Sequence, residues 1–257
     1  MKKEIVFALA AFFLISMSAI TGAYAGDKAS NKKVTILKDR VDLTGDGKKD
    51  TIVIKGIPYE GESDFFREFQ MEVVTSNNQS FTVNIDGGLK PKAKFVDLNH
   101  DRTKDVYISV ETGSRGRITN HYLYTLKNNK LLDITVPDPL VIMSQFLDSY
   151  KASITIQDIG ESYTLDLKSR TKNYEMLGLY QNGKLSEPTE LMVDAYSTLK
   201  PVHVEGKTYG LKGIQAISGV YHSDRIARVE TIWLFENGKW ALKNSKIMES
   251  NKIKRGK

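Results

Sequence analysis

The sequence predicts an all-β protein with little helix, built as a repeat array of four antiparallel β units. Two observations predict this class. Apolar and polar residues alternate in many short runs, of which residues 106–110 (VYISV) are typical, and a period of two residues is that of a β-strand. Asparagine-containing turns also recur at nearly even spacing. Even spacing of one structural element along a chain is the signature of a repeat architecture.

Four turns set the repeat period. They lie 51, 54 and 55 residues apart, and strands rich in aromatic residues precede the last three. Asparagine and glycine tolerate positive φ, and an Asn-Gly pair between two apolar runs is a strong hairpin signal. The four turns are Asn77-Asn78, Asn128-Asn129, Asn182-Gly183 and Asn237-Gly238.

Each turn is expected to lie within one β unit. A β unit of about 50 residues cannot bury both faces alone, so neighbouring units must stack or pack radially. Radial packing gives a propeller-like ring, whereas an open curved array or two packed sheets fits the same period. Ring closure would pair the early strand 34–37 with the late strand 240–242. The expected units are residues 33–86, 87–140, 141–196 and 197–251, and a basic tail follows at 252–257.

Helix is expected only in the connections between these units. The better candidate is residues 188–196, which begin with a proline and follow Ser186, as suits a helix start. Residues 143–150 are a second candidate. Both segments are short, so the all-β class does not depend on them.

The first 25 residues have the three-part layout of a signal peptide. Two lysines precede the apolar run 5–17, and Ala23 and Ala25 provide the small residues before the cleavage point. A membrane anchor is the alternative, but the apolar run is shorter than the roughly 20 residues that span a bilayer. We therefore expect a secreted protein whose residues 26–257 form a single domain, not stably inserted in a membrane.

Composition narrows the kind of partner. The chain has no cysteine, which excludes disulfides, thiolate metal sites and a lipid-modified cysteine. Residues 26–257 keep 35 of the 37 basic and 30 of the 31 acidic side chains, a net charge of +5 that favours anionic surfaces. No basic stripe is interleaved with aromatic residues, so nucleic acid is not expected. The expected partner is an anionic wall polymer, a polysaccharide or a surface protein.

A loop rich in aspartate predicts a Ca²⁺ site in the first unit. Oxygen side chains stand at its positions 1, 3, 5 and 9, as Asp42, Thr44, Asp46 and Asp50. Ca²⁺ takes six to eight hard oxygen ligands. These four side chains, the backbone carbonyl of Lys48 at position 7 and water would supply them.

The second unit repeats the loop 55 residues later. Asp97, Asn99, Asp101 and Asp105 take the same four positions, and the carbonyl of Thr103 takes position 7. The other two units lack these ligands. An acidic surface turn without an ion is the alternative for each loop, but two loops in phase with the hairpins favour Ca²⁺.

The two loops differ at position 6, where the chain must turn sharply. Gly47 stands there in the first loop and Arg102 in the second. A left-handed conformation costs a residue other than glycine about 1–2 kcal/mol. We expect the second site to be the weaker one.

This arrangement resembles the calcium loops of FG-GAP or VCBS-type repeats in integrin-like β-propellers, where D-x-D-x-D-G-x-x-D precedes a strand. The resemblance implies a propeller-like fold, calcium in a structural role and a function in adhesion or extracellular interaction. The specific motif covers about eighteen residues. Thr44 and Asn99 depart from it at position 3, which leaves three carboxylates in each loop.

Catalytic signatures are missing from the sequence. The four histidines are scattered, and neither a nucleophile elbow nor a phosphate-binding glycine loop is present. No catalytic residue is therefore assigned, and a non-enzymatic role is favoured. We expect a secreted calcium-binding protein that acts as a binding or interaction module at the cell surface or wall. The alternatives are an extracellular hydrolase acting on wall polymer or polysaccharide, and an exported structural protein without a ligand.

Overall fold

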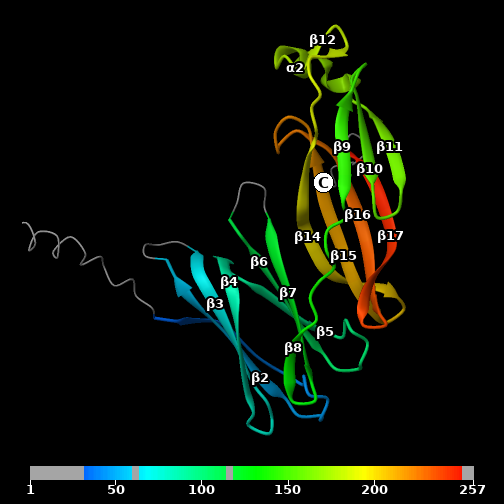
Figure 1. Cartoon of the computed structure of the whole chain (residues 1–257). Coiled ribbons are helices and arrows are strands. Elements are labelled where there is room, and N and C mark those ends of the chain that lie inside the picture. The colour runs from blue at the N-terminus through cyan, green and yellow to red at the C-terminus, as the bar shows by residue number, and fades with distance from the viewer. Residues whose placement is uncertain (1–31, 60–63, 114–117, 251–257) are drawn as a thin grey trace, which may run out of the picture.

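The computed structural model describes residues 32–59, 64–113 and 118–250 (Figure 1). These residues form an all-β protein of several antiparallel sheets, none of them closed into a barrel. None of the helices within these ranges is long and apolar enough to cross a membrane. The expected signal peptide, 1–25, and the basic tail, 252–257, lie outside the described residues.

The first sheet is a four-stranded meander in chain order. Alternate residues of its second strand, among them Ile52 and Ile54, are fully buried, while their neighbours are partly exposed. This is the period of two that the sequence shows. The strands are β1 (Val34–Val41), β2 (Asp50–Pro58), β3 (Phe65–Val74) and β4 (Ser80–Leu89).

The second sheet is also a four-stranded meander, and both of its faces are buried. Ile108 and Val110 belong to the apolar core shared with the first sheet. Tyr107 and Leu123 point to the opposite side and join the core formed with the rest of the chain. The strands are β5 (Lys92–Val96), β6 (Asp105–Glu111), β7 (Thr119–Lys127) and β8 (Lys130–Asp133).

The third sheet has three strands, β9 (Ile142–Leu147), β10 (Lys151–Ile156) and β11 (Glu161–Asp166). The expected helix at 143–150 is wrong, because β9 pairs with β10 over its full length and buries Phe146 on the core side. The chain then forms the short 3₁₀ helix η1 (Lys168–Arg170), the helix α2 (Thr171–Met176) and a small hairpin of β12 (Tyr180–Gln181) and β13 (Lys184–Leu185).

The fourth sheet has the longest strands and again runs in chain order. The expected helix at 188–196 is wrong, because its second half belongs to the first strand of this sheet and pairs with the second. Tyr196 is buried there against the neighbouring sheets. The strands are β14 (Met192–Glu205), β15 (Thr208–Ser218), β16 (Arg225–Glu236) and β17 (Lys239–Glu249).

All four predicted turns are confirmed. Each joins two antiparallel strands, and each carries asparagine at positive φ, from 51° in Asn128 and Asn182 to 65° in Asn78. In the last two turns Gly183 and Gly238 follow at φ 80° and 79°. The local chemistry of these dipeptides thus fixes the hairpins.

The sheets are stacked in the order first, second, fourth, third. Strand β4 contacts β6, β14 contacts β7, and β14 also contacts β9. Within the described ranges β1 pairs only with β2, and β17 only with β16. The expected closing pair between 34–37 and 240–242 is therefore not formed. A propeller is not confirmed, and packed sheets are consistent with this order.

Candidate metal centres

Both aspartate loops fold on the same hydrogen-bond scaffold. In the loop between β1 and β2, Asp50 Oδ2 accepts hydrogen bonds from the backbone N–H of Leu43 at 2.7 Å and of Thr44 at 3.1 Å. In the loop between β5 and β6, Asp105 Oδ2 accepts from the equivalent N–H groups at the same two distances. The aspartate at position 9 thus closes each loop onto its own first residues.

The aspartate at position 1 holds the far side of each loop. Asp42 accepts hydrogen bonds from the N–H of Gly45 at 2.7 Å and of Gly47 at 2.9 Å. In the second loop Asp97 Oδ2 accepts from the N–H of Arg102 at 3.0 Å. Hydrogen bonds to the carboxylates at positions 1 and 9 therefore hold the backbone of both loops in a similar turn.

The residues between these two anchors also bond within the loop. Asp46 Oδ1 accepts from the N–H of Lys48 at 2.8 Å, and Asp101 Oδ1 accepts from the N–H of Thr103 at 3.0 Å. Asn99 Oδ1 accepts from the Asp101 N–H at 2.9 Å. All ten predicted ligand residues thus lie within the two loops, and many of their oxygens already accept a backbone N–H.

Two positions in each loop have positive φ. Position 6 was expected to be one, and Arg102 at φ 72° matches Gly47 at φ 80°. Position 4 is the other, with Gly45 at 74° and His100 at 62°, and sequence reasoning missed it. The second loop therefore holds two bulky residues in a conformation that costs each about 1–2 kcal/mol.

Buried side-chain oxygens without a hydrogen-bond partner among the described residues occur in both loops, as Thr44 Oγ1 in the first and as two carboxylate oxygens in the second. Asp97 Oδ1 and Asp105 Oδ1 are buried and have no hydrogen-bond partner among the described residues. The Asp105 side chain is fully buried, and this burial raises its pKa to about 6, against the effect of the Leu98 N–H. A buried charge without a partner is costly. Both Oδ1 atoms are carboxylate oxygens, the kind of ligand that Ca²⁺ takes, so the donor chemistry of the loop fits Ca²⁺.

In the first loop, a serine from another strand connection hydrogen-bonds the carboxylate oxygen that corresponds to Asp105 Oδ1. Ser76, in the β3–β4 turn, donates its N–H to Asp50 Oδ1 at 2.8 Å and its hydroxyl to Asp46 Oδ2 at 2.5 Å. The hydroxyl contact is the main reason that the pKa of Asp46 is lowered. Ser76 lies 26 residues after Asp50, so no local sequence signal points to it.

A preassembled set of metal-binding side chains is not present. No group of three or more His, Cys, Asp or Glu residues in the described part of the chain is arranged to hold a metal ion. The carboxylates are directed at backbone N–H groups instead. Binding of an ion would thus require some of these side chains to turn.

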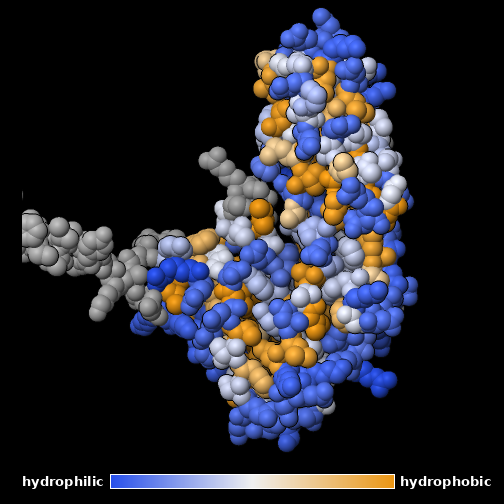
Figure 2. All heavy atoms as spheres, in the orientation of Figure 1, coloured by the Kyte–Doolittle hydropathy of each residue, from blue (hydrophilic) through white to orange (hydrophobic). Residues whose placement is uncertain are grey.

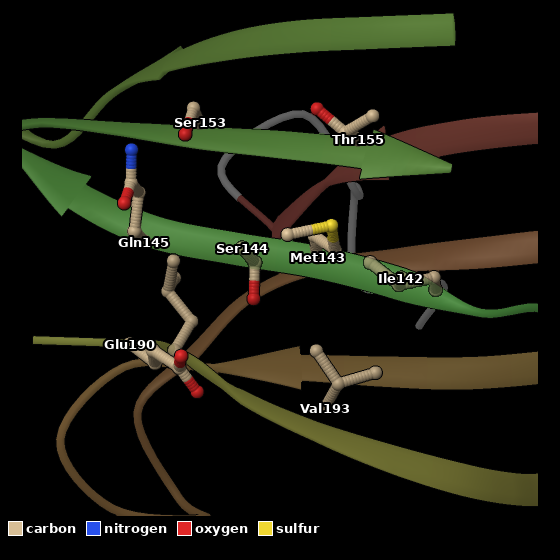
Figure 3. Close-up of a pocket in the computed structure, with 9 residues that line it drawn as sticks. Ile142, Met143, Ser144, Gln145, Ser153, Thr155, Glu190 and Val193 are labelled. Carbon is tan, nitrogen blue, oxygen red and sulfur yellow. The ribbon is translucent and has the colours of Figure 1, made fainter. Parts of the chain in front are cut away.

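A cavity of about 480 Å³ lies apart from the loops, on the outer face of the third sheet (Figure 3). Figure 3 shows Ser153 and Thr155 of β10 on one side and Glu190 on the other, with Met143 and Gln145 of β9 between them. The lining contains one carboxylate and otherwise uncharged groups. It therefore offers no acid and base pair for catalysis.

Comparison with known proteins finds one family model that is similar to part of the chain. Residues 140–248 match the model of the YybI C-terminal domain. The uncharacterized protein YybI of Bacillus subtilis (strain 168) is 27% identical over 210 residues, which are 79% of this chain and 80% of that protein.

One solved structure is similar over most of the chain. The crystal structure of the exotype rhamnogalacturonan lyase YesX covers 86% of this chain with a TM-score of 0.37 and 13% identity. This chain spans about a third of that protein, 34%.

These matches contradict the expected FG-GAP or VCBS resemblance. The matching family model is that of the YybI C-terminal domain, and no FG-GAP or VCBS family matches. The resemblance depended on two nine-residue loops, and both lie outside residues 140–248. A short coiled aspartate loop is a local solution to a β connection, so it does not identify the fold that carries it.

Proposed function

We propose that this chain binds Ca²⁺ in its two aspartate loops and that the ion has a structural role in an exported binding protein. The observation that carries the proposal is the pair of buried carboxylate oxygens in the second loop, Asp97 Oδ1 and Asp105 Oδ1, which have no hydrogen-bond partner among the described residues. Carboxylate oxygens are the ligands that Ca²⁺ prefers. The first loop has the same scaffold and supplies a second, independent site.

Bound calcium would raise the free energy of unfolding and would not take part in a reaction. Position 2 of each loop is a fully buried leucine, Leu43 or Leu98, that anchors the loop to a different apolar core. An ion bound only by the folded loops adds about 2.7 kcal/mol of stability when its concentration is 100 times Kd. That contribution suits an exported chain without disulfides.

The binding role is proposed for the whole array of sheets. An open stack of four β units presents long faces and several connecting loops, and the face seen in Figure 2 is largely hydrophilic with scattered hydrophobic residues. The net positive charge favours an anionic wall polymer or polysaccharide. A soluble, secreted form would place these faces at the cell surface.

Calorimetric titration with Ca²⁺ tests the metal part of the proposal. Two sites are expected, together with a rise in melting temperature that a chelator reverses. Asp105→Asn should weaken the second site at least tenfold, because it removes the charge of the buried oxygens. Asp39→Asn, at an exposed aspartate of β1 outside both loops, is the matched control and should bind as wild type. If millimolar Ca²⁺ changes neither heat nor melting, the metal proposal is wrong.

Two further measurements test export and binding. N-terminal sequencing of the secreted protein is expected to start at Gly26, and an intact Met1 in the membrane fraction would contradict export by cleavage. The secreted protein should sediment with isolated cell wall and leave the wall fragments intact. Release of soluble fragments would instead support the hydrolase alternative.

A further inference from the structure

We propose a second binding site, for a hydroxylated anion such as a sugar acid or a polyol phosphate, between the second and fourth sheets. A cavity of about 240 Å³ lies there, lined by one face of β5, β6 and β7 and by residues 197–200 of β14. The inference rests on the proposed role as a binding protein, but its geometry is independent of calcium. It names the chemistry of the partner and the place where it binds.

Three lysines give the cavity its charge. Lys92 pairs with Glu111, with Nζ 3.3 Å from Oε1. Lys94 and Lys200 also line the cavity and have no ion-pair partner among the described residues. Two cationic groups therefore remain for a ligand. A lysine ammonium binds a carboxylate or a phosphate as a strong point charge.

Strand alternation puts these groups on the same side of the sheet. Lys92 is paired with Ser109, and Ser109 with His121, across three neighbouring strands. Lys94 is paired with Tyr107 in the same way. The residues between them on β6 point to the first sheet and are apolar. The second sheet thus carries a polar row on the face that meets the fourth sheet.

His121 supplies a hydrogen-bond acceptor. The Tyr107 hydroxyl donates to the backbone carbonyl of Leu199, so its oxygen must accept from His121 Nδ1, which lies 2.7 Å away. This fixes the proton on Nδ1 and leaves Nε2 as an acceptor. Nε2 is buried and has no hydrogen-bond partner in the part of the chain that the structure describes. Burial also lowers the pKa of His121 to about 4, so the ring is neutral at pH 7.

Hydroxyl groups complete the lining. Ser109, Thr119, Ser197 and Thr198 line the cavity beside the lysines. A ligand that matches this set carries one negative group for the lysines and neighbouring hydroxyls for the imidazole and the hydroxyl side chains. Drug-sized ligands fill roughly 300–1,000 Å³, so the smaller cavity suits a single unit of a polymer.

The outer face of the third sheet is a weaker candidate for the same ligand. Its cavity is larger, but it contains Glu190 and no cation. An anion would be repelled there. The charge of the lining therefore favours the cavity between the second and fourth sheets.

Titration with small probes, followed by NMR, tests the inference. The probes are D-glucuronate for the carboxylate source, glycerol 1-phosphate for the phosphate source, and D-glucose as the neutral control. At least one anion should bind and glucose should not. The Nε2 resonance of His121 should move on binding, and added salt should weaken the binding because it screens the lysines.

Paired lysine variants locate the site. Lys94→Gln with Lys200→Gln should weaken anion binding about tenfold, because it removes the two lining cations that have no ion-pair partner among the described residues. Lys127→Gln with Lys130→Gln, on the exposed turn of the same sheet, is the matched control and should bind as wild type. These side chains are exposed, so the variants should fold normally.

The outcomes separate this inference from the calcium proposal. Anion binding that persists in the presence of a chelator supports the cavity even if no Ca²⁺ binds. Absence of binding by both anions, or equal binding by the Lys94→Gln, Lys200→Gln variant and wild type, overturns the inference and leaves the metal loops unaffected.

Discussion

Arg102 is the residue at which the two loops differ most in physical terms. It holds φ 72° in the place of Gly47, and it adds a positive charge to the outside of a loop of carboxylates. The backbone strain therefore lowers the stability of the folded protein, whereas the charge lowers its affinity for a cation.

Arg102→Gly is expected to raise the free energy of unfolding by up to about 1 kcal/mol and to tighten Ca²⁺ at the second loop severalfold. Arg102→Lys keeps both the charge and the Cβ atom, so it is the control and should match wild type. Gly47→Arg should do the reverse in the first loop, where no atom lies within 4 Å of an added Cβ. Urea unfolding and calorimetry measure these effects, and weaker Ca²⁺ binding by Arg102→Gly would contradict them.

At the residue scale, the sequence predicts those features of the two loops that depend on the spacing of neighbouring residues. The positions of the loop oxygens and the left-handed Arg102 follow from a nine-residue pattern. His100 at position 4 was missed, although histidine is one of the residues other than glycine that are enriched at positive φ. The buried Oδ1 of Asp105 was also missed, because a carboxylate in a loop motif is expected to be exposed and its burial depends on tertiary packing.

The β3–β4 turn acts as an element of the first loop. Its Ser76 gives one hydrogen bond to Asp50 and one to Asp46, so the turn and the loop close on each other. In the second loop the corresponding strand connection provides no such serine. Thr125 of β7 instead accepts a hydrogen bond from Asn99 Nδ2 at 3.1 Å. Asp50 Oδ1 of the first loop thus accepts a hydrogen bond from Ser76, whereas the equivalent Asp105 Oδ1 has no hydrogen-bond partner among the described residues.

Ser76→Ala is expected to destabilise the calcium-free protein by about 1 kcal/mol, the value of one hydrogen bond. The same change frees Asp46 Oδ2, so Ca²⁺ should bind the first loop more tightly. Ser80→Ala, at the exposed start of β4 in the same hairpin, is the control and should change neither quantity. Melting curves with and without Ca²⁺ provide the measurement. A lower affinity in Ser76→Ala would mean that the serine helps to hold the ion.

At the element scale the hairpins could be predicted and the helices could not. The Asn turns are correct because two residues determine their backbone. Residues 143–150 and 188–196 were interpreted as helix from composition and capping residues. Pairing with β10 and with β15 overrides such weak local preferences. The short helix α2 went unpredicted because only Tyr174 among its residues is buried.

The second aspartate loop lies at the join between the second and fourth sheets. His100 Nε2 is 2.8 Å from the carbonyl of Tyr209 at the start of β15. Leu98 of the same loop belongs to the core that the second sheet shares with the third and fourth. An ion in this loop would therefore act on the contact between two halves of the molecule.

Hydrogen exchange can detect this coupling. Ca²⁺ is expected to slow the exchange of amides at 205–209, in the β14–β15 turn, as well as in the loop itself. Amides of the β16–β17 turn are the internal control and should not respond. His100→Ala should keep Ca²⁺ binding and remove the effect at 205–209. Slowing confined to the loop residues would contradict a coupling role.

The stacking order is the whole-molecule feature that the sequence could not provide. An even period shows that units recur, but it does not determine which units become neighbours. Residues such as Tyr107 and Leu123 alternate in the same way whether their face meets the third unit or the fourth. The ring prediction assumed chain order, and the contact of β14 with both β7 and β9 replaces it with a linear stack.

Gln215, in β15, contacts the chain on both sides of the segment that contains the third sheet and the helix α2. Its side-chain amide bonds both the N–H and the carbonyl of Leu140, at 2.8 and 3.1 Å, and its Nε2 also lies 3.5 Å from the carbonyl of Asp194. The two ends of the third sheet and its helix therefore meet at one residue. The segment 141–193 is therefore an excursion of the chain, which leaves the stack and re-enters it beside the same side chain.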